Sequence, residues 1–264
     1  MISITTAELN ELLAIFLWPL SRILALIASA PIFGNPSIPV RVKLGLAIMI
    51  TILVTPTLAP PPQIDPGSGI GLLIIVQQVI IGLTIGFAMR IVFVAVEMAG
   101  DIIGLQMGLG FATFFDPQSA SQVPLIGRFL GVIASLAFIA IDGHLIMIAI
   151  ISQSFHTLPI SSSGIDAPTL SAMANWGAEI FKSGLQLSLP VLTALLITNL
   201  ALGILTRAAP QLNIFAVGFP LTLAMGILVL ALSLPFFTPI LEHLIQNGYD
   251  LMKGIAGISD TVLP

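Results

Sequence analysis

The sequence predicts an all-α integral membrane protein with about six long apolar helices in hairpins. Its 264 residues include only 8 basic and 12 acidic side chains, and 57% are hydrophobic, whereas soluble domains carry about 25% charged residues. The mean hydropathy is +1.11. The apolar residues also gather in long runs, and about 20 such residues form a helix that crosses the ~30 Å hydrocarbon core of a bilayer. We therefore expect a single membrane-embedded domain over residues 1–264.

Six apolar runs approach or exceed this length, and we expect a helix from each. They cover residues 12–33, 44–59, 70–96, 125–151, 178–206 and 214–241. The second run ends in Pro60–Pro62, and the third is long enough to continue beyond the membrane. Turn-forming residues separate the runs, such as Gly34–Pro36 after the first and Ser161–Gly164 before the fifth.

Several function classes are excluded by what the sequence lacks. It has no cysteine, no run of basic residues for nucleic acid, and no HExxH or GxxxxGK[ST] motif. The GxGD and GxSG patterns of intramembrane proteases are also missing. Asp142, His144 and His156 lack metal-ligand spacing, so we interpret them as turn and interfacial residues. We expect no enzyme activity, no metal site and no cofactor.

Charged residues inside apolar runs point to buried contacts, because a central Arg or Asp costs roughly 2.5–3.5 kcal/mol on insertion scales. Arg22 lies in the middle of the first run. Arg90, Glu97 and Asp101 are spaced seven and four apart, which places them near one helical face, and Arg128 is a candidate partner for the two acids. These five residues predict a buried charge network. An ion or proton pathway is the alternative interpretation.

Glycines at four-residue spacing predict close helix packing. The spaced sets are Gly82 with Gly86; Gly100 with Gly104 and Gly108; and Gly127 with Gly131. Each set lies on one helical face and lets another backbone approach closely.

The segment Ile102–Phe115 is uncharged and combines glycines with a methionine and three phenylalanines. Gly110 is conformationally permissive and Asp116 precedes proline, so the helix should break between Gly108 and Pro117. Irregular backbone at membrane depth is tolerated where protein buries it or where it lines a cavity. The segment suits a constriction or plug, and ordinary packing of the phenylalanines is the open alternative.

Four stretches together resemble the FliR family of export-gate subunits of the bacterial flagellar type III secretion system. They are GLGFATFFDP at 108–117, DGHL at 142–145, SFHTLPI at 154–160 and LGILTRAAPQLNIFAVGFPLTLAMG at 202–226. The resemblance runs essentially end to end and implies a non-enzymatic protein. Such subunits assemble with FliP and FliQ into a helical cone, through the middle of which unfolded flagellar proteins pass. An FlhB-like subunit wraps the entrance of the cone, and an FlhA-like ring lies below it.

The resemblance also implies roles for parts of the chain. Residues 1–177 would pack like FliP, and residues 178–264 would form a FliQ-like helical hairpin with a C-terminal tail. An internal loop at 106–122 would help to plug the closed pore. The implied plug residues are Met107, Gly108, Gly110, Phe111, Phe114, Phe115, Asp116 and Pro117. The implied assembly surface consists of Arg207, Pro210, Gln211, Asn213, Gly218, Phe219 and Pro220.

The implied location is the bacterial inner membrane at the flagellar basal body, in contact with lipid and with no nucleic acid bound. The equivalent gate subunit of a virulence injectisome is one alternative. A secondary transporter is another, supported only by the charges at Arg22, Arg90 and Glu97.

Overall fold

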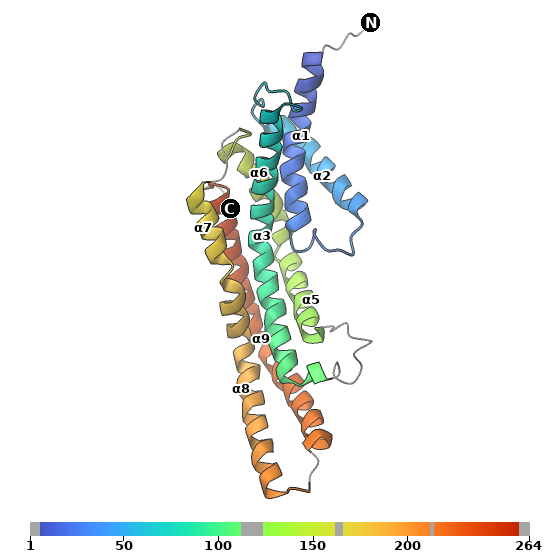
Figure 1. Ribbon diagram of the computed structural model, residues 1–264, viewed down its shortest axis with the longest axis vertical. Helices are drawn as coiled ribbons and strands as arrows, with labels where there is room; N and C mark the ends of the chain where they lie inside the picture. The colour runs from blue at the N-terminus through green and yellow to red at the C-terminus, as the bar shows by residue number, and fades with distance from the viewer. Residues whose placement is uncertain (1–5, 112–123, 162–165, 212–213, 259–264) are drawn as a thin grey trace. The chain divides into compact units, whose positions relative to one another are not determined.

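The computed structural model describes residues 6–111, 124–161, 166–211 and 214–258, and in these ranges the chain is helical without strands. The helices in chain order are α1 (Thr6–Ser29), α2 (Val40–Val54), the 3₁₀ helix η1 (Thr55–Thr57), α3 (Gly69–Gln106), the 3₁₀ helix η2 (Leu109–Phe111), α5 (Leu125–Ala140), α6 (Gly143–Thr157), α7 (Ala167–Trp176), α8 (Glu179–Ala208) and α9 (Ile214–Ile255) (Figure 1). The predicted all-α fold is confirmed.

Five of the described helical stretches are long and apolar enough to cross a membrane. They cover residues 10–29, 40–57, 69–106, 167–208 and 216–255. A sixth candidate is the pair α5 and α6, which is bent by 66°. The predicted number of about six apolar helices therefore agrees with the structure.

The run at 125–151 differs from its expected form, because the structure breaks it into two helices. Asp142 has φ 57°, in the left-handed region, where a helix cannot continue. At the adjacent Gly143, a Cβ atom would lie 2.5 Å from the Phe138 ring and would clash with the Tyr249 hydroxyl. The Asp-Gly pair thus gives both the sharp turn and the room for close packing.

The described residues form two compact units. The first unit comprises 1–91, 138–177 and 246–264, and the second comprises 92–137 and 178–245. The long helices α3 and α9 contribute to both, since the unit boundaries fall at residues 91/92 and 245/246.

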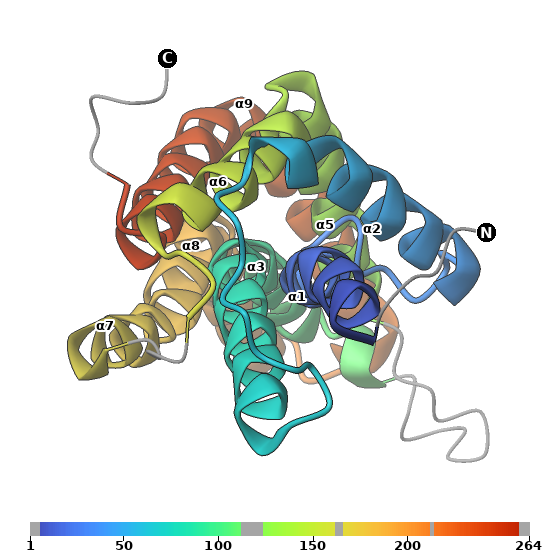
Figure 2. The same cartoon turned by 90° about the horizontal axis from the view of Figure 1, so that it is seen from above.

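In the first unit, α1 and α3 lie side by side (Figure 1, Figure 2). Gly82 and Gly86 form the contact: a Cβ at Gly82 would lie 2.9 Å from the Cβ of Ala25, and one at Gly86 would lie 2.9 Å from the carbonyl oxygen of Leu26. Only glycine permits backbones to approach this closely. The close packing predicted from this glycine pair is confirmed.

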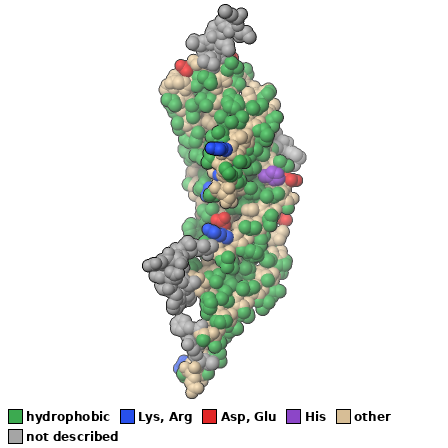
Figure 3. Space-filling model, turned by 90° about the vertical axis from the view of Figure 1, so that its right-hand side faces the viewer, with side chains coloured by type: hydrophobic (Ala, Val, Ile, Leu, Met, Phe, Trp, Pro, Cys, Tyr) green, Lys and Arg blue, Asp and Glu red, His purple; other side chains and the backbone are tan. Residues whose placement is uncertain are grey.

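The helices differ strongly in how much of them the chain itself buries. In the most apolar part of α3, 67% of the residues are buried within the chain. The corresponding share is only 17% in the stretch 167–208 and 28% in the stretch 216–255. Figure 3 shows one face, on which apolar side chains dominate and charged ones are few. Much of α8 and α9 therefore has apolar side chains available for lipid or for other protein.

Candidate functional site

The crossing of α3 and α5 in the second unit is built on glycine. A Cβ atom at Gly100 would lie 2.5 Å from the Cα of Gly127 and 2.7 Å from the carbonyl carbon of Ile126. Gly104 is less crowded, because its nearest neighbour would be Ile126 Cγ1 at 3.7 Å. The close approach predicted from the spacing is confirmed, and its tightest point is Gly100 against Gly127.

Two acidic side chains of α3 lie against α5 at this crossing. A Cβ at Gly127 would clash with Asp101 Oδ1, and a Cβ at Gly131 would lie 3.1 Å from Glu97 Oε1. Asp101 is half-buried, and its Oδ1 is buried with no hydrogen-bond partner in the described part of the chain. Glycines on α5 thus provide the space in which these carboxylates sit within an apolar span.

The α3 helix ends just before the segment that the sequence singles out as a plug. Its last residue is Gln106, and Gly108 follows with φ 85°, a conformation that strongly favours glycine. The helix therefore ends two residues earlier than expected, and the short helix η2 (Leu109–Phe111) follows.

Met107 is anchored on α9 at this helix end. Its side chain is fully buried, at 0% exposure, and a Cβ at Gly226 would lie 2.5 Å from Met107 Cγ. The Thr222 hydroxyl, one turn earlier on α9, shares its single proton between the Phe219 carbonyl oxygen at 3.0 Å and the Met107 carbonyl oxygen at 3.3 Å. The chain is therefore held at Met107, immediately before the left-handed Gly108.

The structure places only part of the predicted plug. Gly108 and Gly110 are half-exposed. Phe114, Phe115, Asp116 and Pro117 lie outside the described residues, as does the side chain of Phe111. Their role stays a prediction.

Arg22 is the most deeply buried charge of the first unit, with 0% exposure. Its Nε donates to Gln78 Oε1 (2.8 Å), its Nη1 to the carbonyl and hydroxyl oxygens of Ser154 (2.9 and 3.1 Å), and its Nη2 to the Leu158 carbonyl (2.8 Å). The guanidinium carbon lies 4.2 Å from the centre of the Phe155 ring. A planar group with five N–H donors suits so many acceptors.

The position of these acceptors explains how an apolar interior holds a cation. Ser154 and Leu158 lie at the end of α6 (Gly143–Thr157), where the helix dipole is negative. The Ser154 carbonyl oxygen also accepts from the Leu158 backbone N–H over 2.9 Å, so Arg22 is its second donor. In the described residues, Arg22 thus meets a helix C-terminus, a glutamine and an aromatic ring. The arrangement joins α1, α3 and α6.

The other residues of the predicted charge network lie differently from Arg22. Arg90, Glu97 and Arg128 are exposed on the single chain, and Asp101 is half-buried. The prediction of burial therefore fits Arg22 best, and the predicted network among all five residues stays a prediction.

The predicted assembly surface lies at the turn between α8 and α9. Arg207, Pro210 and Gln211 are exposed, as are Phe219 and Pro220 at the start of α9. Gly218 is buried, and Asn213 lies outside the described residues.

Sequence reasoning missed the partners of Arg22 and the anchor of Met107. Gln78 is a polar residue in a long apolar run, and such a residue is itself a sign of a buried hydrogen bond. Ser154 and Leu158 belong to the stretch SFHTLPI, but their backbone acceptors leave no mark in the residue type. Thr222 and Gly226 are one helical turn apart, a spacing that indicates a shared helical face. The spacing does not reveal that Met107 packs against this face.

The described residues contain no group of three His, Asp or Glu side chains that could hold a metal ion. The observed interactions join helices to one another: glycine contacts, a buried guanidinium and a methionine anchor. Together with the membrane-scale helices and the largely exposed apolar faces of α8 and α9, they define the class of an all-helical integral membrane protein built for close helix packing.

Comparison with known proteins identifies the particular family. Residues 13–248 match the model of the family described as bacterial export proteins, family 1. The chain belongs to this family, the FliR family of flagellar export-gate subunits.

Related proteins cover nearly the whole chain. The chain is 48% identical to the flagellar biosynthetic protein FliR of Pectobacterium carotovorum subsp. carotovorum over 91% of this chain and 92% of that protein. It is 45% identical to FliR of Escherichia coli (strain K12), over 97% of both chains. FliR of Bacillus subtilis (strain 168) is 27% identical over 94% of this chain and 96% of that protein.

Proposed function

We propose that this chain is a non-enzymatic core subunit of the flagellar type III protein export gate, which forms with FliP and FliQ the channel for unfolded flagellar proteins. The observation that carries the proposal is the similarity to FliR over 97% of both chains. FlhB-like and FlhA-like proteins would complete the gate in the bacterial inner membrane. The flagellar names of the relatives favour this assignment over an injectisome subunit.

The exposed apolar surface of the helical hairpin supports assembly with other subunits. Large apolar side chains that are more than half exposed occur on both α8 and α9: Phe181, Leu196, Ile197, Leu200, Ile204, Ile227, Leu228, Leu232 and Phe236. Lipid or protein must cover so many apolar groups. In the proposal, residues 178–264 pack as a FliQ-like hairpin and residues 1–177 pack like a FliP subunit.

Assembly is tested by copurification of the full chain with FliP and FliQ. Arg207→Glu should reduce the recovered complex, because it reverses a charge at the α8–α9 turn. Lys182→Glu is the matched control, since Lys182 is an exposed basic residue on the same helix, and its Nζ lies 2.9 Å from Glu179 Oε1. Equal recovery of the two variants would contradict the assembly surface.

The plug is the second part of the proposal. The anchor at Met107 and the left-handed Gly108 support it, since they provide a fixed point followed by a turn. Deletion of residues 110–116 should leave assembly intact and raise the leak of ions or small solutes through the closed gate. An unchanged conductance of the assembled complex would refute the plug.

A further inference from the structure

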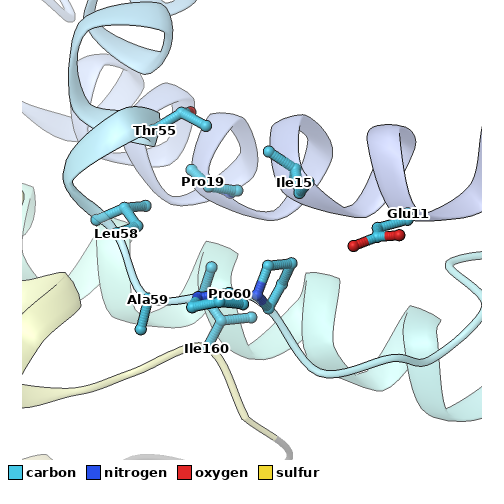
Figure 4. Close-up of a pocket in the computed structure, with 9 residues that line it drawn as sticks. Glu11, Ile15, Pro19, Thr55, Leu58, Ala59, Pro60 and Ile160 are labelled. Atoms are coloured by element: carbon cyan, nitrogen blue, oxygen red, sulfur yellow. The ribbon is translucent and has the colours of Figure 1, made fainter. Parts of the chain in front are cut away.

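A small cavity in the first unit lies between α1 and the segment that follows α2. It has a volume of about 250 Å³. Its walls come from three parts of the chain that are distant in sequence: Glu11, Ile15 and Pro19 of α1; Thr55, Leu58, Ala59, Pro60 and Pro61; and Ile160 beyond α6. Figure 4 shows Leu58, Ala59 and Pro60 across the cavity from the α1 residues.

The lining combines apolar walls with a single charge. Among the described residues that line the cavity, Glu11 is the one with an ionisable side chain, and it is exposed. The other polar side chain, Thr55, already donates its hydroxyl proton to the Thr51 carbonyl over 2.7 Å. The side chains of the lining therefore offer acceptors, and one of them carries a negative charge.

The walls are held rigidly. Beside the cavity, Trp18 and Ile74 are fully buried in a cluster against which Ile160 packs. The carbonyl of Leu158, two residues before Ile160, is held by Arg22. Pro60 and Pro61 have fixed φ angles, so a ligand that binds there does not have to order this wall.

Exposed apolar side chains also occur on α1 and at the end of α2, outside the lining of the cavity. Leu12 and Leu13, which follow Glu11 on α1, are 59% and 50% exposed, and Leu53 near the end of α2 is 69% exposed. A fully water-soluble ligand would gain nothing from these neighbours, whereas an apolar protein segment would cover them.

We propose that this cavity binds a lysine or arginine side chain, presented by an apolar segment of a partner subunit. The volume is below the ~300–1,000 Å³ of typical small-molecule pockets, and it suits one long side chain. The alkyl stem would pack on Ile15, Pro19 and Leu58, and the cationic head would meet the Glu11 carboxylate, as long basic side chains do at the edges of apolar surfaces. This inference rests on the proposed membership of a multi-subunit gate.

Two variants of the full chain, coexpressed with FliP and FliQ, test the cavity. Glu11→Lys places a positive charge where the partner's cation would lie, and Ala59→Trp fills the space without changing the charge. An exposed ion pair contributes up to about 1 kcal/mol, which corresponds to about a fivefold change, so replacing attraction by repulsion should lower complex recovery about fivefold. Glu242→Lys makes the same charge change at an exposed residue of α9 that does not line the cavity, and it should leave recovery unchanged.

A photocrosslinker at position 59 identifies the occupant within the recovered complex. The expected product is a partner peptide that contains Lys or Arg, and changing that residue to Glu should restore recovery of the Glu11→Lys variant. Crosslinks only to lipid, only to peptides without a basic residue, or equal behaviour of the Glu11→Lys and Glu242→Lys variants would overturn the inference. Failure of the unmodified chain to copurify would instead contradict the proposed gate membership.

Discussion

The crossing of α3 and α5 makes a quantitative prediction for Gly100→Ala. The added Cβ would lie 2.5 Å from the Gly127 Cα and 2.6 Å from its nitrogen. All the nearest atoms belong to backbone, so no side-chain rotation relieves the clash. An ordinary contact begins at 3.4 Å, so the two helices must separate locally by about 0.9 Å, which forfeits a quarter to a half of the dispersion energy of the affected contacts.

The expected strain from such overpacking is about 1–3 kcal/mol. Alanine favours the helix by about 1 kcal/mol relative to glycine, and this gain must be separated from the strain. Gly203→Ala is the matched control, since Gly203 lies in α8 of the same unit and its Cβ would meet nothing within 4 Å. The helix-propensity gain cancels between the two variants, so Gly100→Ala should be less stable than Gly203→Ala by about 1–3 kcal/mol.

The assay is unfolding of the purified full chain in detergent micelles by a denaturing detergent, followed by circular dichroism. The Gly203→Ala variant should be as stable as the unmodified chain or more stable. If both variants shift the unfolding midpoint equally, the close α3–α5 contact is refuted.

Three further changes test other contacts. Arg22→Met should destabilise the chain by about 2–5 kcal/mol in the same unfolding assay, because it leaves buried acceptors without donors. The control is Arg128→Met, at an exposed position, which should change stability by less than about 0.5 kcal/mol. Gly226→Leu should displace the buried methionine at the end of α3, and faster amide hydrogen exchange at residues 103–107 would report this; unchanged exchange would argue against the anchor. Asp166 is exposed and caps α7, and the hydrogen bonds from Thr169 lower the pKa of its carboxyl. This cap should persist at neutral pH and be lost as the pH falls below about 4, the ordinary pKa of aspartate. Hydrogen exchange in α7, corrected for the intrinsic pH effect, should then rise, and Asp166→Ala should remove this pH dependence.

Composition and spacing predict most of this fold because membrane helices need long apolar runs and close crossings need small residues. The spaced sets that contain Gly82, Gly100 and Gly127 therefore indicate helix faces that pack closely, whereas the contact of Gly100 with Gly127 is known only from the structure. The break at Asp142 is harder to predict, because apolar residues continue on both sides of it and one left-handed residue decides the bend.

The backbone acceptors of the buried charge could not be predicted from residue types. Arg22 donates to the carbonyl oxygens of Ser154 and Leu158, and every residue has such an oxygen, so only the position of the α6 end selects them. The choice of Glu97 and Asp101 as members of a charge network rests on helical spacing alone. The structure adds that both carboxylates approach glycines of α5, which spacing along one helix does not reveal.

The bend between α5 and α6 determines the parity of membrane crossings. Five other stretches are long and apolar enough to cross. If all five cross, a pair that crosses as one broken span gives six crossings and places the two ends in the same compartment, whereas a re-entrant pair gives five and places them in opposite compartments. The backbone at Asp142 therefore sets the sidedness of everything downstream, including the compartment that faces the turn after α8. Reporter fusions before α5 and after α6 would read this out directly, since the two arrangements differ in whether the reporter changes sides.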